Sequence, residues 1–252
     1  YESGRSNTGV WQTTMGYTSG WFNTGNAQTS VGYGAGSSNS GTNQTAVGYF
    51  AGLGNIGDYQ ASLGVESGFQ NTADHQTSFG RRAGYANQGD YQVAIGSQSG
   101  QGNTGLSQIA LGYYSGFDNA GDRQILIGDQ TGTYMIGDDN TYIGYEAARY
   151  DQGASPNINS SQSIAIGNFT KPLTESDTNS VILGYNANGA GSNTVVLGND
   201  AIIQTVLKGQ ITLPIQFPTT GAGVSNGSMF YGTDGALYFK GGSGTVTMIA
   251  PN

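Results

Sequence analysis

Apolar residues recur at a fixed interval along much of the chain, each directly before a glycine. An aliphatic residue, Met or Phe precedes every one of nine glycines spaced sixteen residues apart, and a Gln stands four places before each of the first eight. This pattern predicts sixteen-residue structural repeats. The glycines are Gly16, Gly32, Gly48, Gly64, Gly80, Gly96, Gly112, Gly128 and Gly144, and the glutamines are Gln12, Gln28, Gln44, Gln60, Gln76, Gln92, Gln108 and Gln124.

Within each repeat the apolar residues alternate, as Val93 with Ile95 and Ile109 with Leu111. Such alternation predicts a short β-strand with one buried face. Helices are disfavoured because each interior Gly costs about 0.5–1 kcal/mol relative to Ala. Strands one repeat apart would stack as parallel neighbours about 4.8 Å apart. We therefore expect an all-β parallel β-roll, or β-solenoid.

Small uncharged residues lie between the alternating aliphatic ones, for example Ser30, Ala46 and Ala94. If the aliphatic face fills the coil, this small face remains outside, and a thin coil cannot cover both faces. We expect it to pack against copies of the chain, as a homotrimer around a common axis. The recurring glutamines would then stack, each amide donating to the next and accepting from the last, and fix the register.

The segments "NQTAVGYFAG", "QVAIGSQSG" and "SQSIAIG" resemble the repeats of trimeric autotransporter adhesin heads, and more closely the repeats of bacteriophage tail fibres. The resemblance extends over residues 1 to 200 or so. It implies a left-handed β-roll of three chains wound together, used as a rigid shaft or head that meets a cell surface.

The regularity of the pattern divides the chain into four parts. Regular repeats occupy residues 1–149, and an irregular continuation with the outward loop "YDQGASPNINSSQ" occupies 150–203. Residues 204–220 resemble the neck that closes such heads. Residues 221–252 predict a small β-meander of three strands and resemble the C-terminal tip of phage fibre proteins.

Charge and apolar content restrict the partners. The net charge is −8, and the eight basic residues are scattered apart from Arg81 and Arg82, which argues against nucleic acid. No run of about 18 apolar residues is present, so no membrane insertion as a helix is expected.

Residues for catalysis are scarce. His75 is the sole histidine and Cys is absent, which leaves no material for a catalytic triad or a His/Cys zinc site. Asp58, Asp74 and Asp90 share one phase of the repeat, which favours a role in turn geometry over a carboxylate pair for glycoside hydrolysis. Stacked carboxylates should repel one another and could instead recruit Ca²⁺ as a ladder. We expect no enzyme and no cofactor.

Aromatic residues also recur in phase. They could stack on the sugar rings of a surface glycan, but covering the roll or filling seams between chains is the favoured interpretation. Recognition is expected in loops or at the C-terminal tip, with Tyr231, Asp234, Tyr238 and Lys240 as candidate surface binding residues. The recurring aromatics are Tyr17, Tyr33, Tyr49, Tyr113 and Tyr145, and Trp21, Phe69, Tyr85 and Phe117.

The resemblance, taken together with these observations, implies a non-enzymatic homotrimeric fibre of a phage tail, located in the virion. It would bind a host-cell surface glycan or protein and join other virion tail proteins. A cellular autotransporter-type adhesin and a purely structural extracellular filament are the alternatives. An autotransporter would have a coiled-coil stalk and a membrane barrel near its C-terminus. The sequence that leads to "TMIAPN" contains neither heptads nor alternating membrane strands, which favours the phage interpretation.

Overall fold

The computed structural model describes residues 2–206, 228–231, 236–240 and 246–250. The chain divides into two compact units, Tyr1–Ile203 and Gln204–Asn252, which are considered separately. No helix among the described residues is long and apolar enough to cross a membrane.

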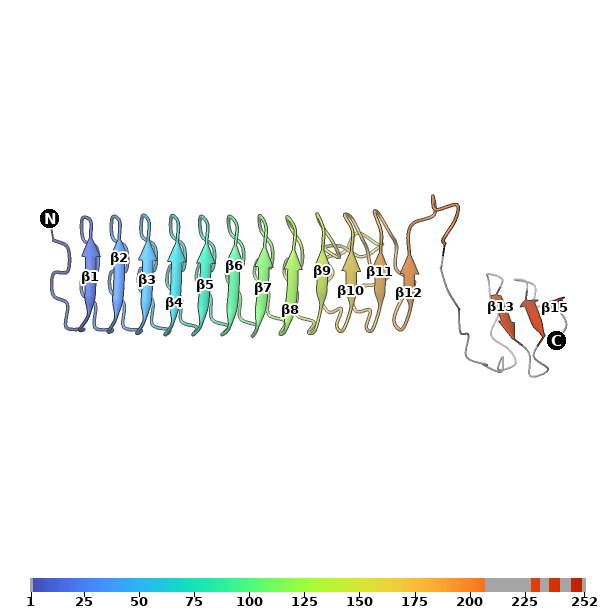
Figure 1. The fold of residues 1–252 in the computed structure, drawn as a ribbon, viewed down its shortest axis with the longest axis horizontal. Helices are drawn as coiled ribbons and strands as arrows, with labels where there is room; N and C mark the ends of the chain where they lie inside the picture. The colour runs from blue at the N-terminus through green and yellow to red at the C-terminus, as the bar shows by residue number, and fades with distance from the viewer. Residues whose placement is uncertain (1, 207–227, 232–235, 241–245, 251–252) are drawn as a thin grey trace. The chain divides into compact units, whose positions relative to one another are not determined.

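The first unit is one parallel sheet of twelve short strands that follow each other in sequence order (Figure 1). Each strand is followed by a return segment that leads to the start of the next, so the unit is a β-solenoid. The strands are β1 (Gln12–Met15), β2 (Gln28–Val31), β3 (Gln44–Val47), β4 (Gln60–Leu63), β5 (Gln76–Phe79), β6 (Gln92–Ile95), β7 (Gln108–Leu111), β8 (Gln124–Ile127), β9 (Thr141–Ile143), β10 (Ile164–Ile166), β11 (Val181–Leu183) and β12 (Val195–Leu197).

Register follows the sequence period. Gln12 pairs with Gln28 and Met15 with Val31, and the same sixteen-residue offset holds from β1 to β9. Later pairs, such as Thr141 with Ile164, have other offsets because the return segments change length. The all-β solenoid of sixteen-residue repeats is thus confirmed.

The glycine after each strand brings successive coils into backbone contact. Gly96 has a φ of 127°, in the region that favours glycine, and a Cβ there would lie closer than 3.0 Å to the carbonyl oxygen of Gly112. A side chain would therefore separate the coils. This close approach explains why the sequence keeps Gly at each sixteenth position.

The strand face that lies inside the coil is the opposite of the one that the sequence predicts. In β6, Gln92 and Ala94 are buried, whereas Ile95 faces outward and is 39% exposed. The prediction that the aliphatic residues fill the coil is wrong, because the interior at these strands is narrow and small side chains already fill it. The small residues Ala, Ser, Asn and the flat amides of Gln occupy it instead.

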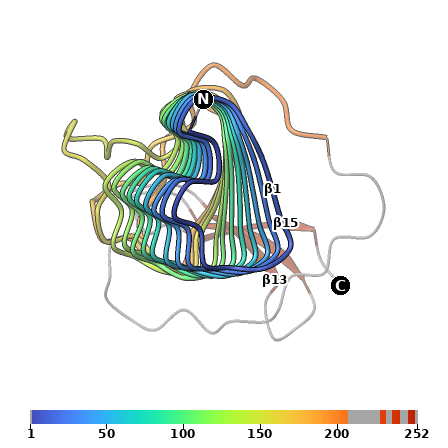
Figure 2. The same cartoon turned by 90° about the vertical axis from the view of Figure 1, so that its left-hand side faces the viewer.

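The interior widens towards the end of the solenoid. Leu126, Met135, Tyr142 and Ile182 form a hydrophobic core there with neighbouring alanines. The return segment after β9 is longer, and residues 152–156 are exposed before Asn157 re-enters the interior and donates to the Ala148 carbonyl at 2.9 Å. Figure 2 looks along the stack, and the yellow segment that leaves the coil outline is this expected outward loop.

The second unit contains an antiparallel sheet of β13 (Ser228–Tyr231), β14 (Leu237–Lys240) and β15 (Val246–Ala250). These strands lie within residues 221–252, where the sequence predicts a small β-meander. Most of the expected neck, from residue 207 to residue 220, lies outside the described residues. Both expected turns of the meander lie outside them as well.

Candidate functional site

The outward face of the solenoid sheet carries two parallel rows of side chains that contain no charged residue. One row stands directly before the glycines and the other two residues earlier, and every member belongs to a strand. Between Val47, Leu63 and Phe79 the face is hollowed by about 300 Å³. From β2 to β8 the rows are Val31, Val47, Leu63, Phe79, Ile95, Leu111 and Ile127, and Thr29, Thr45, Ala61, Thr77, Val93, Ile109 and Ile125.

These rows form a surface suited to association. Phe79 is 51% exposed and Leu63 is 42% exposed, and their neighbours along the stack are exposed or half-buried. Burying the exposed half of one such side chain contributes about 1 kcal/mol. An apolar stripe of this length on one chain is typical of a protein–protein contact. We call it the outward apolar face; sequence reasoning had assigned this role to the small-residue face, which lies inside.

The glutamines stack in register inside the coil, but their amides do not form the expected chain of Gln-to-Gln bonds. Gln92 Nε2 donates to the Gly105 carbonyl of the next coil at 2.7 Å, and its Oε1 accepts from Asn87 Nδ2 at 2.5 Å. The narrow interior brings the strand amide against the opposite Asn-x-Gly turn, which supplies its hydrogen-bond partners. All eight glutamines donate to a carbonyl in this way.

The aspartates of the suggested calcium ladder bind backbone amides. Asp74 Oδ1 accepts from the Asp58 N–H at 2.7 Å, and Asp90 Oδ1 accepts from the Asp74 N–H at 2.8 Å. Asp58 does the same for Thr42 at 2.7 Å. Among the described residues, no group of three or more His, Cys, Asp or Glu side chains is placed to hold a metal ion. Each of these three carboxylates thus accepts from a backbone N–H group in the coil before it.

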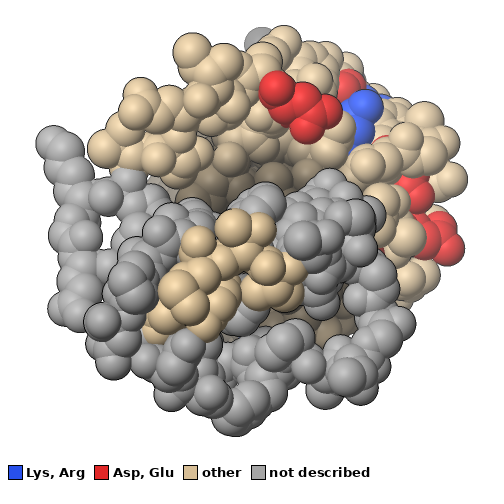
Figure 3. All heavy atoms as spheres, turned by 90° about the vertical axis from the view of Figure 1, so that its right-hand side faces the viewer, with Lys and Arg blue, Asp and Glu red and all other residues tan. Residues whose placement is uncertain are grey.

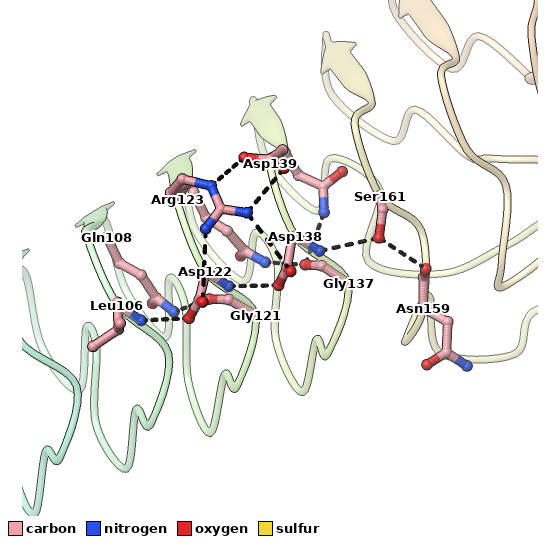
Figure 4. A network of polar contacts seen from close by, with 12 residues as sticks. Leu106, Gln108, Gly121, Asp122, Arg123, Gly137, Asp138, Asp139, Asn159 and Ser161 are labelled. Atoms are coloured by element: carbon pink, nitrogen blue, oxygen red, sulfur yellow. Dashed lines mark hydrogen bonds and ion pairs between the residues drawn. The ribbon is translucent and has the colours of Figure 1, made fainter.

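Arg123 lies among three carboxylates (Figure 4). Its Nε is 2.5 Å from Asp139 Oδ1, and its terminal nitrogens lie 3.7 Å from Asp122 Oδ2 and 3.8 Å from Asp138 Oδ2. The hydrogen bond from Arg123 lowers the pKa of the Asp139 carboxyl. Sequence reasoning missed this cluster, although Arg123 and Asp139 are sixteen residues apart and so occupy the same place in successive coils. The described surface seen in Figure 3 carries few charged groups.

Several recurring aromatic rings stack from coil to coil. Tyr17, Tyr33 and Tyr49 follow one another with ring centroids 5.2 Å apart. The lone histidine, His75, lies between Tyr59 and Tyr91 at 4.9 and 4.7 Å. Rings that contact each other in this way stabilise the stack, which supports their structural interpretation.

The candidate binding residues of the C-terminal unit are only partly placed. In the β13–β14 pairing Tyr231 lies opposite Leu237 and Lys240 opposite Ser228, at the two ends of the ladder. Tyr238 is half-buried in β14, and Asp234 lies outside the described residues. The register therefore separates Tyr231 from Lys240.

Comparison with known proteins assigns no family. No protein-family model matches the chain, and no curated protein matches its sequence.

Proposed function

We propose that this chain is a non-enzymatic fibre protein of a phage tail, in which three copies associate along their solenoids into a rigid shaft or head of the virion. The fibre contacts a glycan or protein on the host-cell surface and is joined to other tail proteins. The similarity of the repeats to those of phage tail fibres supports this class.

The observation that carries the proposal is the outward apolar face. It runs over successive strands without a charged residue, in a fold whose own interior is too narrow to accept it. Copies arranged side by side around an axis parallel to the stack would present the same rows to one another at every coil. Closed cyclic symmetry of this kind gives each copy an equivalent environment.

The coil-to-coil bonds support a mechanical role. Successive coils are joined by strand pairing and by Gln amides such as that of Gln92, and in several coils also by a backbone N–H group bonded to a carboxylate, as Asp74 N–H is to Asp90. A stack in which every coil is fixed to both neighbours resists bending, as a shaft requires.

Light scattering on the purified chain tests the association. We expect a mass of three times the 26.0 kDa of one chain. Leu63→Glu places a carboxylate on the outward apolar face and should lower the mass, because burying an unpaired charge is costly. Gln70→Glu is the matched control, since Gln70 is exposed but lies outside the strands. A folded monomer for the unaltered chain would contradict the proposal.

A second experiment tests where the fibre contacts cells. Deletion of residues 204–252 removes the second unit at the boundary between the two compact units. We expect the shortened protein to keep its strand signature in circular dichroism and to lose attachment to host cells. Attachment at the original level would contradict a role for this unit in recognition.

A further inference from the structure

A hollow of about 260 Å³ opens between aromatic side chains on the return segments of the solenoid. Its walls are Tyr113, Tyr114 and Phe117 after β7 and Tyr134 after β8. Neighbouring ring centroids lie 4.5, 5.0 and 5.6 Å apart along this series, at steep angles to one another. No member belongs to a strand, so the hollow is separate from the outward apolar face.

The hollow exists because two sixteen-residue columns change from large to smaller side chains at the same coil. Phe117 is followed by Thr133, and Tyr114 is followed by Gln130. Where the first column keeps large rings, as at Phe69 and Tyr85, they stack at 5.0 Å with an angle of 3°. Thr133 is 5% exposed, so this short side chain closes the hollow from within while the rings stand around it.

The polar groups of the hollow are a planar guanidinium and a planar amide, and a neighbouring carboxylate offsets the positive charge. Arg149 lines it and forms an ion pair with Glu146 at 2.7 Å, with both side chains less than a quarter exposed. Arg149 also donates to the Gln130 side-chain carbonyl. The guanidinium charge is thereby offset, while amide and guanidinium edges remain next to the rings.

Aromatic faces carry partial negative charge and attract the weakly positive C–H groups of an apolar ring face. Amide and guanidinium groups offer paired hydrogen-bond positions that match adjacent hydroxyls. A pyranose ring has both features, and the small volume suits one ring of a chain rather than a large ligand. From this combination we propose that the hollow around Thr133 binds a ring of a neutral saccharide.

This site is complete within one chain and does not depend on the proposed trimer. The test uses the full chain and three neutral probes, the methyl glycosides of glucose, galactose and N-acetylglucosamine, with N-acetylneuraminic acid as an anionic comparison. Saturation-transfer NMR and calorimetry measure binding. We expect at least one neutral probe to bind, and the anionic sugar to bind more weakly because Glu146 offsets Arg149.

Three variants locate the binding. Tyr134→Ala should weaken it by about tenfold, the loss expected for one aromatic contact. Thr133→Phe continues the Phe117 column into the hollow and should abolish binding without lowering the unfolding temperature. Tyr59→Ala is the matched control, because Tyr59 and Tyr134 are 55% and 53% exposed with φ of 57° and 61°.

Several results would overturn the proposal. They are no binding of any neutral probe at millimolar concentration, stronger binding of the anionic sugar, and unchanged binding in Thr133→Phe. If Tyr134→Ala lowers the oligomer mass and leaves sugar binding unchanged, the hollow is a contact between copies and the proposal fails. Loss of the trimer with sugar binding retained would reject the proposed function and leave this site standing.

Discussion

Asn103 and Gln108 are joined inside the coil by a hydrogen bond of 2.7 Å from Asn103 Nδ2 to Gln108 Oε1. The same Asn amide also lies 3.2 Å from Gln92 Oε1 of the preceding coil. Gln108 in turn donates to the Gly121 carbonyl of the following coil at 2.5 Å. One buried amide pair therefore connects three coils.

Gln108→Ala should destabilise the solenoid by about 2–6 kcal/mol. The change leaves the Asn103 amide and the Gly121 carbonyl without this partner in a buried place, and each loss costs about 1–3 kcal/mol. Urea unfolding at fixed protein concentration measures the effect. Gln88→Ala is the control, because Gln88 is exposed. Equal midpoints for the two variants would contradict the role assigned to Gln108.

Gln108→Glu should make stability depend on pH in a defined direction. Burial raises the folded-state pKa of a carboxyl above its unfolded value, so the stability is present below the unfolded pKa and is lost as pH rises through the folded pKa. We expect the variant to be closer to the unaltered protein at about pH 4 than at about pH 7. A difference of the opposite sign in urea midpoints would contradict this.

Gly96→Ala should prevent normal stacking at β6 and β7. The new Cβ would collide with the backbone of Gly112, and the φ of 127° is strained for any L-residue. Gly54→Ala separates the two effects, because Gly54 has a φ of 73° but a Cβ there meets only Gln70 Cγ at 3.6 Å. We expect Gly54→Ala to cost about 1–2 kcal/mol and Gly96→Ala to cost several times more in thermal unfolding.

Asp74→Asn should preserve stability, whereas Asp74→Ala should cost about 1 kcal/mol. The Asn side-chain oxygen can still accept from the Asp58 N–H, and Ala cannot. Thermal unfolding with and without added CaCl₂ provides the second readout. A calcium-dependent rise in the unfolding temperature that Asp74→Asn removes would favour the ladder of metal ligands over the backbone role.

Arg123→Gln should raise the pKa of Asp139, because the hydrogen bond from Arg123 is the main cause that lowers it. Asp139 has a lowered folded-state pKa, so its contribution to stability is present above the unfolded value near 3.8 and is lost as pH falls through the folded pKa. Carboxyl ¹³C NMR titration measures the change directly. An unaltered Asp139 titration in Arg123→Gln would contradict the assignment.

Sequence patterns predict register better than they predict which face is inside. The spacing of Gln12 and Gln28 fixes their pairing, because parallel coils repeat with the period of the chain. Alternation at Val93 and Ile95 identifies two strand faces, but the width of the coil decides which one is buried, and a linear pattern does not contain that width. The result is that Ile95 faces outward.

Local contacts can likewise be divided into those that the sequence period reveals and those that depend on the width of the coil. The Arg123–Asp139 pair and the change from Phe117 to Thr133 both become visible when the sequence is written in rows of sixteen. The direction of the Gln108 amide does not, since it depends on the distance across the coil to Gly121. Residue columns are thus accessible from sequence, and contacts across the interior require the structure.

The identical offset from β1 to β9 also makes the length of the solenoid adjustable in whole units. Removing residues 81–96 would join two segments that carry the same columns, so the glycines, glutamines and outward rows would still align across the junction. Removing a number of residues that is not a multiple of sixteen would shift the register of every later repeat, so the columns would no longer align. The regular part of this chain can therefore be shortened or lengthened in steps of sixteen residues without disturbing the alignment of its columns.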